Sequence, residues 1–576
     1  MTRTWGNVAL DMDVRQRMLA AALAVSALVA APAAAAPGDL DPSFSNDGRV
    51  STLTSPDTFV ARAVAVQPDG RIVVAGYSCD TGTCGPTGDS SFRLVRYTAD
   101  GGLDTDFGMG GMVTTAIGAG RSQAYDVLVG PDGKLVVGGV ASIDMADPGS
   151  FALARYLPDG RLDPGFGAGG TVLMRVGEGF DAISDLLEGW GGRVVAVGQA
   201  RDDGRDHFAL ARFTEGGAPD APFDSGGAVI VPTSAPYAYA AGGAMLPDGR
   251  IVAVGGSGQS AAVEILRFSG AVVGDSGDTV APWVNPVGAT YSYANAAVAL
   301  PDGRGVLSAG VATERSGHPA MALVRTSAEG ALDRAWDADG TALARTRDGS
   351  VATDVVLEPD GRAVAAGHSS LGAQHAFMLA RFDGAGGLDR SFGSQGAVLT
   401  DFPGTAVTRA TALARQADGK LVVAGIACAG GSGPQCGGGT ARLALARYQG
   451  GDAAAAAPAG GVPGGNGRSP GAAPFVRLPT RLDSRRGKVK VRVRCLQAKR
   501  CRGKLSLRRL RTKRSAPLIG SRMVSIRAEQ AATFTVKLRR KGLGSSRKLQ
   551  VRIEFAGRDA AGVKRKVTRR VTLRRG

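Results

Sequence analysis

The stretch Pro68-Asp-Gly-Arg-Ile-Val-Val-Ala-Gly76 sets the architecture, because the same phrase returns six more times along the 576-residue chain. It joins an Asp-Gly turn signal to a short apolar run that ends in glycine. The turn glycines of the seven copies lie 54 to 63 residues apart: Gly70, Gly133, Gly192, Gly249, Gly303, Gly361 and Gly419. Seven copies at one period are typical of a repeat architecture.

Each copy carries four short strand signals. In the first copy they span residues 63–67, 71–77, 92–97 and 111–115, and the Asp-Gly dipeptide between the first two is a hairpin signal. Four antiparallel strands in each of seven units predict an all-β fold, a seven-bladed β-propeller. A solenoid is the alternative, but its units are usually shorter and its strands parallel.

The two ends of the repeat array predict closure of a ring. A Leu-Asp-x-x-Phe-Gly element, first seen as Leu103–Gly108, leads into the fourth strand of most copies. The element is decayed after the third and fourth copies and missing after the seventh. An orphan copy, Leu40-Asp-Pro-Ser-Phe44, stands near the start of the chain and leads into Arg49-Val-Ser51. We expect this N-terminal strand to complete the last blade, which removes two exposed sheet edges.

These three motifs in fixed order resemble the bacterial delta-60 repeat, over about residues 37–449. The resemblance implies an exported bacterial protein with β-propeller-like repeats and no established common activity. Residues 450–474 are rich in Gly, Ala and Pro and predict a linker.

The first 36 residues predict a signal peptide. Arg15 and Arg17 precede a short apolar run, and small residues follow it as an Ala-x-Ala cleavage zone. A membrane anchor is the alternative, but the run is short for a span. No later segment is long and apolar enough to cross a membrane, so we expect a secreted, extracellular protein, with association to the cell envelope as a further option.

The six cysteines agree with export, since they fall in three close pairs. An even count in an exported chain predicts local disulfides, with zinc binding as the alternative. The pairs are Cys79/Cys84, Cys428/Cys436 and Cys495/Cys501. Two of the pairs lie in the longest loops, those of the first and last blades, which predicts a rigid recognition edge or a brace across the closure.

One arginine recurs in the third strand of every copy: Arg96, Arg155, Arg212, Arg267, Arg325, Arg381 and Arg447. A ring of cations for an anionic ligand is one interpretation. We favour an internal ion pair with an aspartate of each blade, because a residue kept in every blade usually serves the blade and arginine offers a rigid donor fork. The recurring aromatic residues of the Leu-Asp-x-x-Phe element are interpreted as packing anchors. They are Phe44, Phe107, Phe166, Phe223, Trp336 and Phe392.

Residues 475–576 form a basic tail that alternates apolar and charged positions. It holds 34 Lys and Arg against 4 Asp and Glu, whereas the rest of the chain is net acidic. The alternation over 488–495, 534–538, 549–555 and 567–573 predicts a small Ig-like β-sandwich. The tail also resembles the basic Ig-like modules that end many exported actinobacterial proteins.

A net charge of +30 on about a hundred residues indicates an anionic partner, such as a cell-wall polymer or another anionic surface. A solvated basic surface is the alternative. Nucleic acid is a weaker option, because aromatic residues for base stacking are sparse. The candidate anion-binding residues are Lys488, Lys490, Arg492, Arg494, Arg508 and Arg509.

No catalytic, cofactor-binding or metal-binding motif stands out, so no cofactor is expected and the leading hypothesis is a non-catalytic binding or scaffold protein of the cell envelope. In that hypothesis the propeller presents a face to an unknown protein or glycan, and the tail is an electrostatic tether. The alternative is a propeller hydrolase or lyase acting on extracellular glycans. A carboxylate cluster in the central channel favours the enzyme, and a channel lined by small side chains favours the scaffold.

Overall fold

A computed structural model describes residues 35–451 and the strands of the C-terminal region. Among these residues, every regular element is a β-strand. Within 35–451 the description omits residues 54–57, 80–89, 145, 225, 234, 259–266, 275–278, 285–290, 314–317, 372–373 and 430–439. The predicted signal peptide, up to residue 34, and the predicted linker from residue 452 onward also lie outside it.

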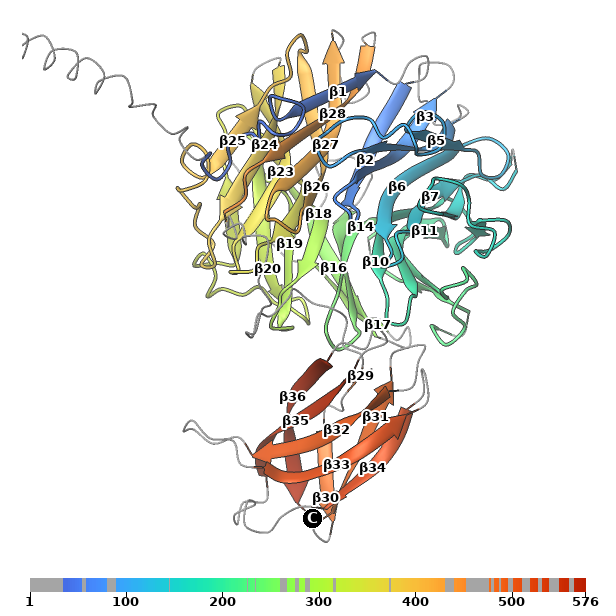
Figure 1. The fold of residues 1–576 in the computed structure, drawn as a ribbon, viewed down its shortest axis with the longest axis vertical. Coiled ribbons are helices and arrows are strands. Elements are labelled where there is room, and N and C mark those ends of the chain that lie inside the picture. Colours follow the sequence, from blue (N-terminus) through green and yellow to red (C-terminus); the bar gives the residue numbers. More distant parts are fainter. Residues whose placement is uncertain are drawn as a thin grey trace, which may run out of the picture.

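The repeats fold as antiparallel four-stranded sheets, which defines a β-propeller (Figure 1). Five of the sheets follow one another along the chain: β2 (Thr58–Val66), β3 (Ile72–Cys79), β4 (Ser90–Tyr97) and β5 (Met112–Thr115); β6 (Ser122–Val129), β7 (Leu135–Ala141), β8 (Ser150–Tyr156) and β9 (Thr171–Met174); β10 (Asp181–Glu188), β11 (Val194–Asp202), β12 (Arg205–Phe213) and β13 (Ala228–Val231); β14 (Tyr237–Met245), β15 (Ile251–Gly258), β16 (Arg267–Val273) and β17 (Thr279–Val284); β18 (Tyr291–Ala299), β19 (Gly305–Thr313), β20 (Ala320–Ser327) and β21 (Thr341–Ala344).

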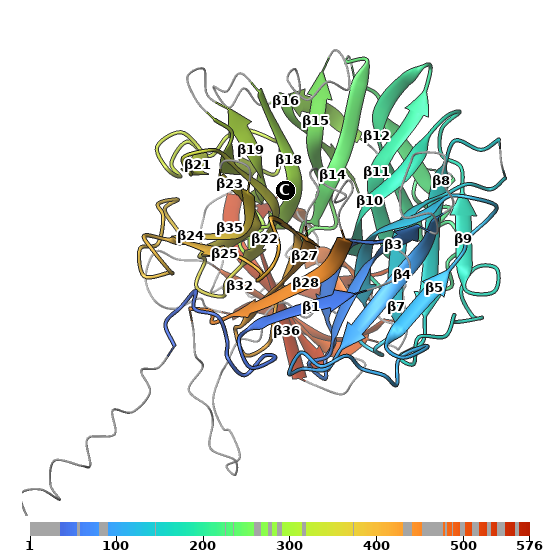
Figure 2. The ribbon, with the colours of Figure 1, turned by 90° about the horizontal axis from the view of Figure 1, so that it is seen from above.

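The remaining repeat strands form two further groups that a single bridge, between His375 and Val407, links into one sheet. The first group holds β22 (Ser350–Leu357), β23 (Ala363–Leu371), β24 (Gln374–Phe382) and β25 (Ala397–Thr400). The second holds β26 (Val407–Arg415), β27 (Leu421–Ala429) and β28 (Thr440–Tyr448). Figure 2 looks onto the propeller, with β14, β18 and β22 near its centre and β5, β9 and β21 at its outside.

The N-terminal strand closes the propeller, as its orphan motif predicts. β1 (Arg49–Leu53) pairs antiparallel with β28, so the two ends of the repeat array lie in one sheet (Figure 2). Backbone hydrogen bonds extend this junction upstream, since Gly38 donates to Gln449 and Gln449 donates to Asp39. The pairing leaves neither terminal strand of the array with a free edge at this junction.

A β-bulge in every inner strand explains the glycine that ends each repeated phrase. In β10 the register with β11 shifts between Ile183 and Asp185, which leaves Ser184 as the extra residue. The shift brings the Ala182 carbonyl oxygen so close to Gly198 that a Cβ added there would lie 2.0 Å from it. In each of the other repeats, the equivalent glycine lies just as close to the carbonyl oxygen at the equivalent position of its own inner strand. These glycines are Gly76, Gly139, Gly255, Gly310, Gly367 and Gly425.

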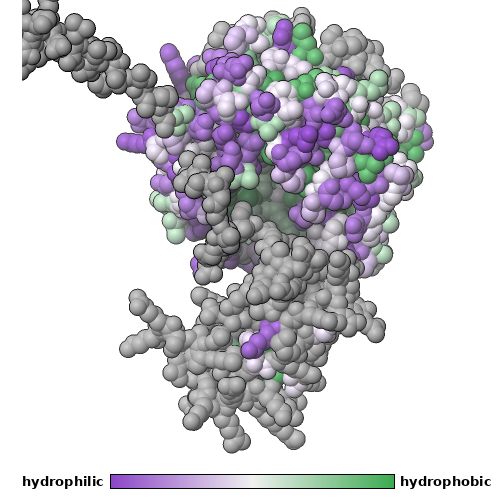
Figure 3. Space-filling model, viewed as in Figure 1, coloured by the Kyte–Doolittle hydropathy of each residue, from purple (hydrophilic) through white to green (hydrophobic). Residues whose placement is uncertain are grey.

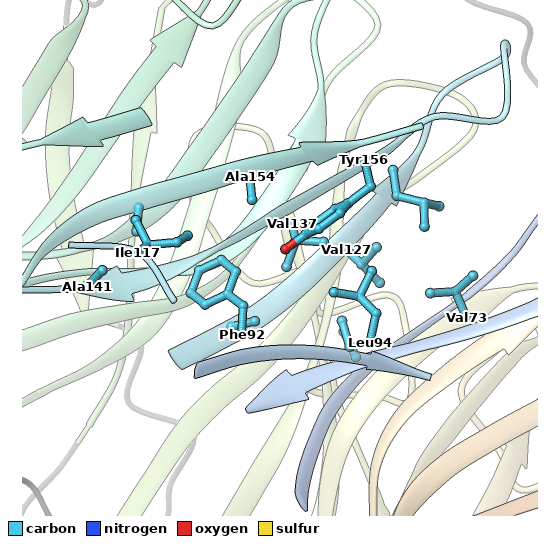
Figure 4. Close-up of a cluster of buried hydrophobic side chains, with 14 of the residues drawn as sticks. Val73, Phe92, Leu94, Ile117, Val127, Val137, Ala141, Ala154 and Tyr156 are labelled. Carbon is cyan, nitrogen blue, oxygen red and sulfur yellow. The ribbon is translucent and has the colours of Figure 1, made fainter. Parts of the chain in front are cut away.

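The hydrophobic core is divided into clusters between adjacent sheets. Figure 4 shows the cluster between the first two sheets, where Phe92 and Leu94 of β4 pack against Val127 of β6 and Tyr156 of β8. Another cluster joins the ends of the array, because Phe44 and Ile72 share it with Leu445. On the face drawn in Figure 3, hydrophilic side chains cover most of the propeller.

Six repeat arginines make the internal ion pair that the sequence analysis favours, each through Nε to the Leu-Asp aspartate of its blade. In the third blade, Arg212 Nε lies 2.6 Å from Asp220 Oδ2, and the guanidinium covers the ring of Phe223. A second cation, Arg193, follows the Gly191-Gly192 turn of this copy and binds the same aspartate oxygen. The other five pairs are Arg96–Asp104, Arg155–Asp163, Arg325–Asp333, Arg381–Asp389 and Arg447–Asp41.

Arg267 departs from this pattern, and its assignment as a repeat arginine is corrected. In the third blade, Val195 pairs with Arg212, but in the fourth blade the equivalent Val252 pairs with Val272. Arg267 instead begins β16 and pairs with Ser257. The Leu-Asp element of this copy is decayed, so the motif that accompanies the arginine in the other copies is not intact here.

The basic tail is also a β structure, with its eight strands linked into one hydrogen-bonded sheet. The strands are β29 (Val476–Arg477), β30 (Arg481–Arg485), β31 (Lys488–Cys495), β32 (Cys501–Arg509), β33 (Leu518–Ile526), β34 (Ala531–Lys537), β35 (Lys548–Arg558) and β36 (Lys564–Arg575). They include all four segments expected from the alternation. Val489, Val491, Leu505 and Leu507 are buried in it. The Ig-like sandwich itself stays a prediction.

Candidate functional site

The bulges of the inner strands place one residue from each repeat around a common cavity of about 560 Å³. The bulge residues are unlike one another in type, yet all of them line the cavity: Arg62, Tyr125, Ser184, Ala241, Asn295, Thr353 and Thr411. The volume falls within the ~300–1,000 Å³ of small-molecule sites. The centre of the propeller is therefore a concave site.

Three carboxyl groups line this cavity, each one residue after a bulge. They belong to Asp126, Asp185 and Asp354. Each carboxyl accepts a backbone hydrogen bond from a neighbouring inner strand: Asp126 from Leu186, Asp185 from Gly243 and Asp354 from Leu413, at 2.7 to 2.8 Å. These bonds fix the carboxyl groups in place and tie the blades together.

The three carboxyl groups hold protons more tightly than ordinary aspartates do. Burial raises the pKa of Asp354 to about 7, although the amides of Leu413 and Val355 partly oppose this, and the charge of Asp126 adds to the rise. Burial and the neighbouring Asp126 raise the pKa of Asp185 well above its usual range, and the pKa of Asp126 is also raised. The carboxyl groups of Asp126 and Asp185 interact with each other, and the charge of Asp126 adds to the rise in the pKa of Asp185, so the two groups titrate as a coupled pair.

Another part of the cavity wall is formed by a cation, Arg62, and an aromatic residue, Tyr125, and the ring of Tyr77 lies close to both. Arg62 is exposed to the cavity, and its Nη2 donates to the Tyr77 hydroxyl at 3.3 Å. The guanidinium lies 5.6 Å from the ring centre of Tyr77 and 5.4 Å from that of Tyr125. In the described part of the chain, Arg62 forms no salt bridge with a carboxylate. The cavity therefore has an acidic part and a separate cationic part.

The residues singled out from the sequence lie away from this cavity. Six of the repeat arginines form ion pairs inside their blades. The recurrent aromatic residues are buried as packing anchors: Phe44, Phe107, Phe166, Phe223, Trp336 and Phe392. The anion-binding candidates Lys488, Lys490, Arg492 and Arg494 occupy alternate positions of β31, and Arg508 and Arg509 end β32. Their side chains are outside the described set.

The cysteine predictions fall mostly outside the described residues. Cys79 ends β3 and Cys428 lies in β27, and both are disulfide-bonded. Cys84 and Cys436 are not described, nor are the side chains of Cys495 and Cys501. The three pairings, and the clipped recognition edge built on two of them, stay predictions.

Two of the four histidines, His368 and His375, lie near each other. The rings of His368 and His375 lie 6.0 Å apart, and burial together with Arg409 lowers the pKa of His368 to about 4. Across the described residues, no group of three or more His, Cys, Asp or Glu side chains could hold a metal ion. The same portion of the chain contains no helix long and apolar enough to span a membrane.

Sequence reasoning missed the cavity residues, although the repeats contain a signal for them. When the copies are aligned on the glycine that ends each phrase, the bulge residue stands 14 positions before it, as Ser184 does before Gly198. The fifth copy, with Asn295 and Gly310, needs 15 positions. Asp126, Asp185 and Asp354 each stand 13 positions before their glycine. The residue types at these positions differ from copy to copy, so a search for repeated residue types does not find them.

Fold and cavity together define a β-propeller with an acidic central site, and comparisons with known proteins agree on the fold. Residues 67–107 and 130–166 match a family model described as a β-propeller domain of unknown function, DUF5122. This match supports a propeller-like repeat protein. No curated protein matches the sequence.

Three enzymes or enzyme-like proteins are among the solved structures that the chain matches at low identity. A polysaccharide lyase of family PL25, an ulvan lyase bound to a GlcA(1-4)Rha3S unit, has 10% identity and a TM-score of 0.39, covering 70% of this chain and 96% of the lyase. A gluconolactonase from Xanthomonas campestris has 12% identity and a TM-score of 0.29, covering 58% and 95%. A bat influenza N11 neuraminidase-like protein has 10% identity and a TM-score of 0.29, covering 73% and 98%.

The expectation that the protein is not an enzyme is corrected by the content of the cavity. The cavity holds a cluster of carboxyl groups, the feature that favours an enzyme over a scaffold in the sequence argument.

Proposed function

We propose that the protein is a glycan-acting hydrolase whose active site is the central cavity. The observation that carries this proposal is the presence of three carboxyl groups, those of Asp126, Asp185 and Asp354, in the lining of one cavity. Carboxyl groups whose environments push their pKa values apart suit separate acid and base roles. Hydrolysis of a glycosidic bond needs one carboxylic acid and one carboxylate.

The different protonation of the three groups assigns their roles. The Asp126–Asp185 pair, in which burial raises both pKa values, acts as the general acid, giving a proton to the glycosidic oxygen as its bond to the anomeric carbon breaks. Asp354, whose pKa is about 7, is partly ionised there and takes a proton from the water that attacks the anomeric carbon. The amides of Leu186, Gly243 and Leu413 hold the carboxyl groups in fixed positions.

Asp185→Asn tests the proposal, because asparagine can still accept the Gly243 hydrogen bond but cannot supply the proton. Wild type and variant are incubated with a panel of polysaccharides, and new reducing ends are measured. We expect wild type to cleave at least one glycan and the variant to lose about 100-fold or more in kcat, without any lowering of its unfolding midpoint.

Asp132→Asn is the matched control, since Asp132 lies in an exposed Asp-Gly turn. It should keep full activity. Equal activity of the Asp185 variant and wild type would contradict the proposed role. A product with a new double bond, formed without consumption of water, would replace hydrolysis by a lyase reaction.

We also propose that the propeller is a closed ring of seven blades, exported and held near an anionic polymer by its basic tail. The pairing of β1 with β28 and the repeat count support the ring. The tail's charge of +30 supports the tether, and no aromatic-rich nucleic-acid motif accompanies it. The tail's alternating strands are those of a small Ig-like module.

Salt tests the tether, because attraction between exposed charges is screened within about 10 Å at 0.1 M salt and within about 3 Å at 1 M. We expect about 1 M NaCl to release the full-length protein from the envelope fraction of its host. A chain that ends at residue 451 should not be retained at low salt. Retention of that shortened chain would overturn the tether.

A further inference from the structure

The cationic part of the cavity, around Arg62, has no role in the proposed hydrolysis. Among the bulge residues, Arg62 is the one with a charged side chain, whereas the other six are Tyr, Ser, Ala, Asn and Thr. Closing the bulge therefore does not require a cation. A guanidinium facing the cavity in the first blade needs another explanation.

The neighbours of Arg62 orient its charge without neutralising it. Tyr77 offers a hydroxyl at 3.3 Å, and the rings of Tyr77 and Tyr125 stand at 90° to each other with centres 6.3 Å apart. Tyr125 is itself held by a 2.8 Å hydrogen bond to Gln123 Oε1. Cation–π contacts fix the guanidinium but supply no full negative charge. Its planar N–H fork matches the paired oxygens of a carboxylate or a sulfate.

The carboxyl groups of the cavity do not serve as counter-ions. Within the described residues, neither Asp126, Asp185 nor Asp354 forms a salt bridge with Arg62. A ligand that spans the cavity therefore meets an unneutralised cation in one part and, in another, carboxyl groups that hold their protons more tightly than ordinary aspartates do. The first part suits an anionic substituent, and the second suits sugar hydroxyls and the glycosidic oxygen.

We propose that Arg62, Tyr77 and Tyr125 form a subsite for an anionic sugar, one that carries a carboxylate or a sulfate. The inference rests on the proposed function, since it names the class of glycan that the same cavity takes. Arg62 is a binding residue here: its guanidinium pairs with the anionic substituent while the tyrosine rings hold the guanidinium in place.

The test compares full-length wild type with Arg62→Gln by calorimetric titration, using two probe pairs. Oligogalacturonate is set against its carboxyl-reduced form, and sulfated dextran oligosaccharide against unsulfated dextran. The basic tail is the same in both proteins, so its contribution cancels in the comparison. Arg161→Gln is the matched control, because Arg161 lies in an exposed Asp-Gly turn.

We expect Arg62→Gln to bind the preferred anionic probe about 10- to 100-fold more weakly, as expected for loss of a charge-assisted hydrogen bond. Binding of the neutral probes and the unfolding midpoint should be unchanged, and Arg161→Gln should match wild type. The probe that loses affinity identifies the substituent as carboxylate or sulfate.

Two results separate this subsite from the hydrolase proposal. Loss of anionic binding in Arg62→Gln without any cleavage by wild type would keep the subsite and overturn the hydrolase. Equal binding of both anionic probes by wild type and Arg62→Gln would overturn the subsite, whether or not wild type cleaves a glycan.

Discussion

The variant Arg447→Ala is expected to lose about 3 kcal/mol or more of the free energy of unfolding, because it leaves a buried carboxylate at the closure of the propeller without its arginine. Arg447 and Asp41 are 406 residues apart in the chain, yet Nε and Oδ2 lie 2.8 Å apart. Both side chains are about 5% exposed or less. Among the six arginine–aspartate pairs, this one joins the two ends of the array.

Several further contacts of Arg447 are lost with its side chain. Nη2 donates to the Ser43 hydroxyl, Nη1 donates to the Ala99 carbonyl oxygen of the first blade, and the guanidinium covers Phe44. Burial by itself would raise the pKa of Asp41, but hydrogen bonds from Ser43 and Lys420, with the charge of Arg447, hold this pKa at about 2. Lys420 remains in the variant, so part of the stabilisation of the carboxylate survives.

Urea unfolding measures the loss, and hydrogen exchange shows where it acts. Peptides from residues 49–53 and 443–448 should exchange faster in Arg447→Ala, since β1 and β28 separate more readily. Arg161→Ala is the control: its side chain is 77% exposed beside Asp159, so we expect a change below about 1 kcal/mol. Unchanged protection of β1 in Arg447→Ala would show that the backbone pairing alone closes the propeller.

Features that depend on the same residue types in every repeat could be predicted from the sequence. The Asp-Gly hairpins, the orphan Leu-Asp element that places β1, and the arginine–aspartate pairs each repeat a residue type at a fixed spacing. Such repetition arises when the same residues make the same packing contacts in every blade. Where the repetition decays, as in the element that follows Arg267, the register cannot be predicted from the sequence, and the prediction for that arginine is wrong.

The candidate site could not be predicted in this way, because each blade contributes a different residue to it. Asp126 and Asp185 lie 59 positions apart and meet only when successive inner strands stand side by side. The residue types on either side of them do not indicate a β-bulge. The repeat keeps the position of the bulge, through the close approach at Gly198 and its equivalents, while the residue at that position is free to vary. That division lets one scaffold carry a specific cavity.

The variant Asp354→Asn is expected to remove a large part of the pH dependence of stability. The pKa of Asp354 is about 7 in the folded protein, against 3.8 as its ordinary value. Between these values the folded protein holds a proton that the unfolded chain releases. The free energy of unfolding therefore falls as pH rises from about 4 to about 7, by up to about 4 kcal/mol from this group alone.

Asparagine keeps the geometry and removes the proton, since its carbonyl oxygen can accept the 2.7 Å hydrogen bond from the Leu413 amide. We expect the variant and wild type to be nearly equally stable at pH 4. At pH 7 the variant should be the more stable by a few kcal/mol. Asp126 and Asp185 titrate in the same direction, so a smaller slope remains. Urea unfolding at a series of pH values measures both curves, and Asp132→Asn should follow wild type.

Asp41 gives the opposite dependence and helps to separate the two effects. Its pKa is lowered to about 2, so the stability that it contributes is present above its ordinary value of 3.8 and is lost as pH falls towards 2. Wild type is then most stable near pH 4, whereas Asp354→Asn should show a broader maximum that extends towards neutral pH. Parallel curves for the two proteins would mean that Asp354 ionises normally in the cavity, and the base assigned to the hydrolase would lose its physical support. A variant that is more stable but inactive would show that the chain gives up stability to keep this carboxyl group, as expected of a residue held for chemistry.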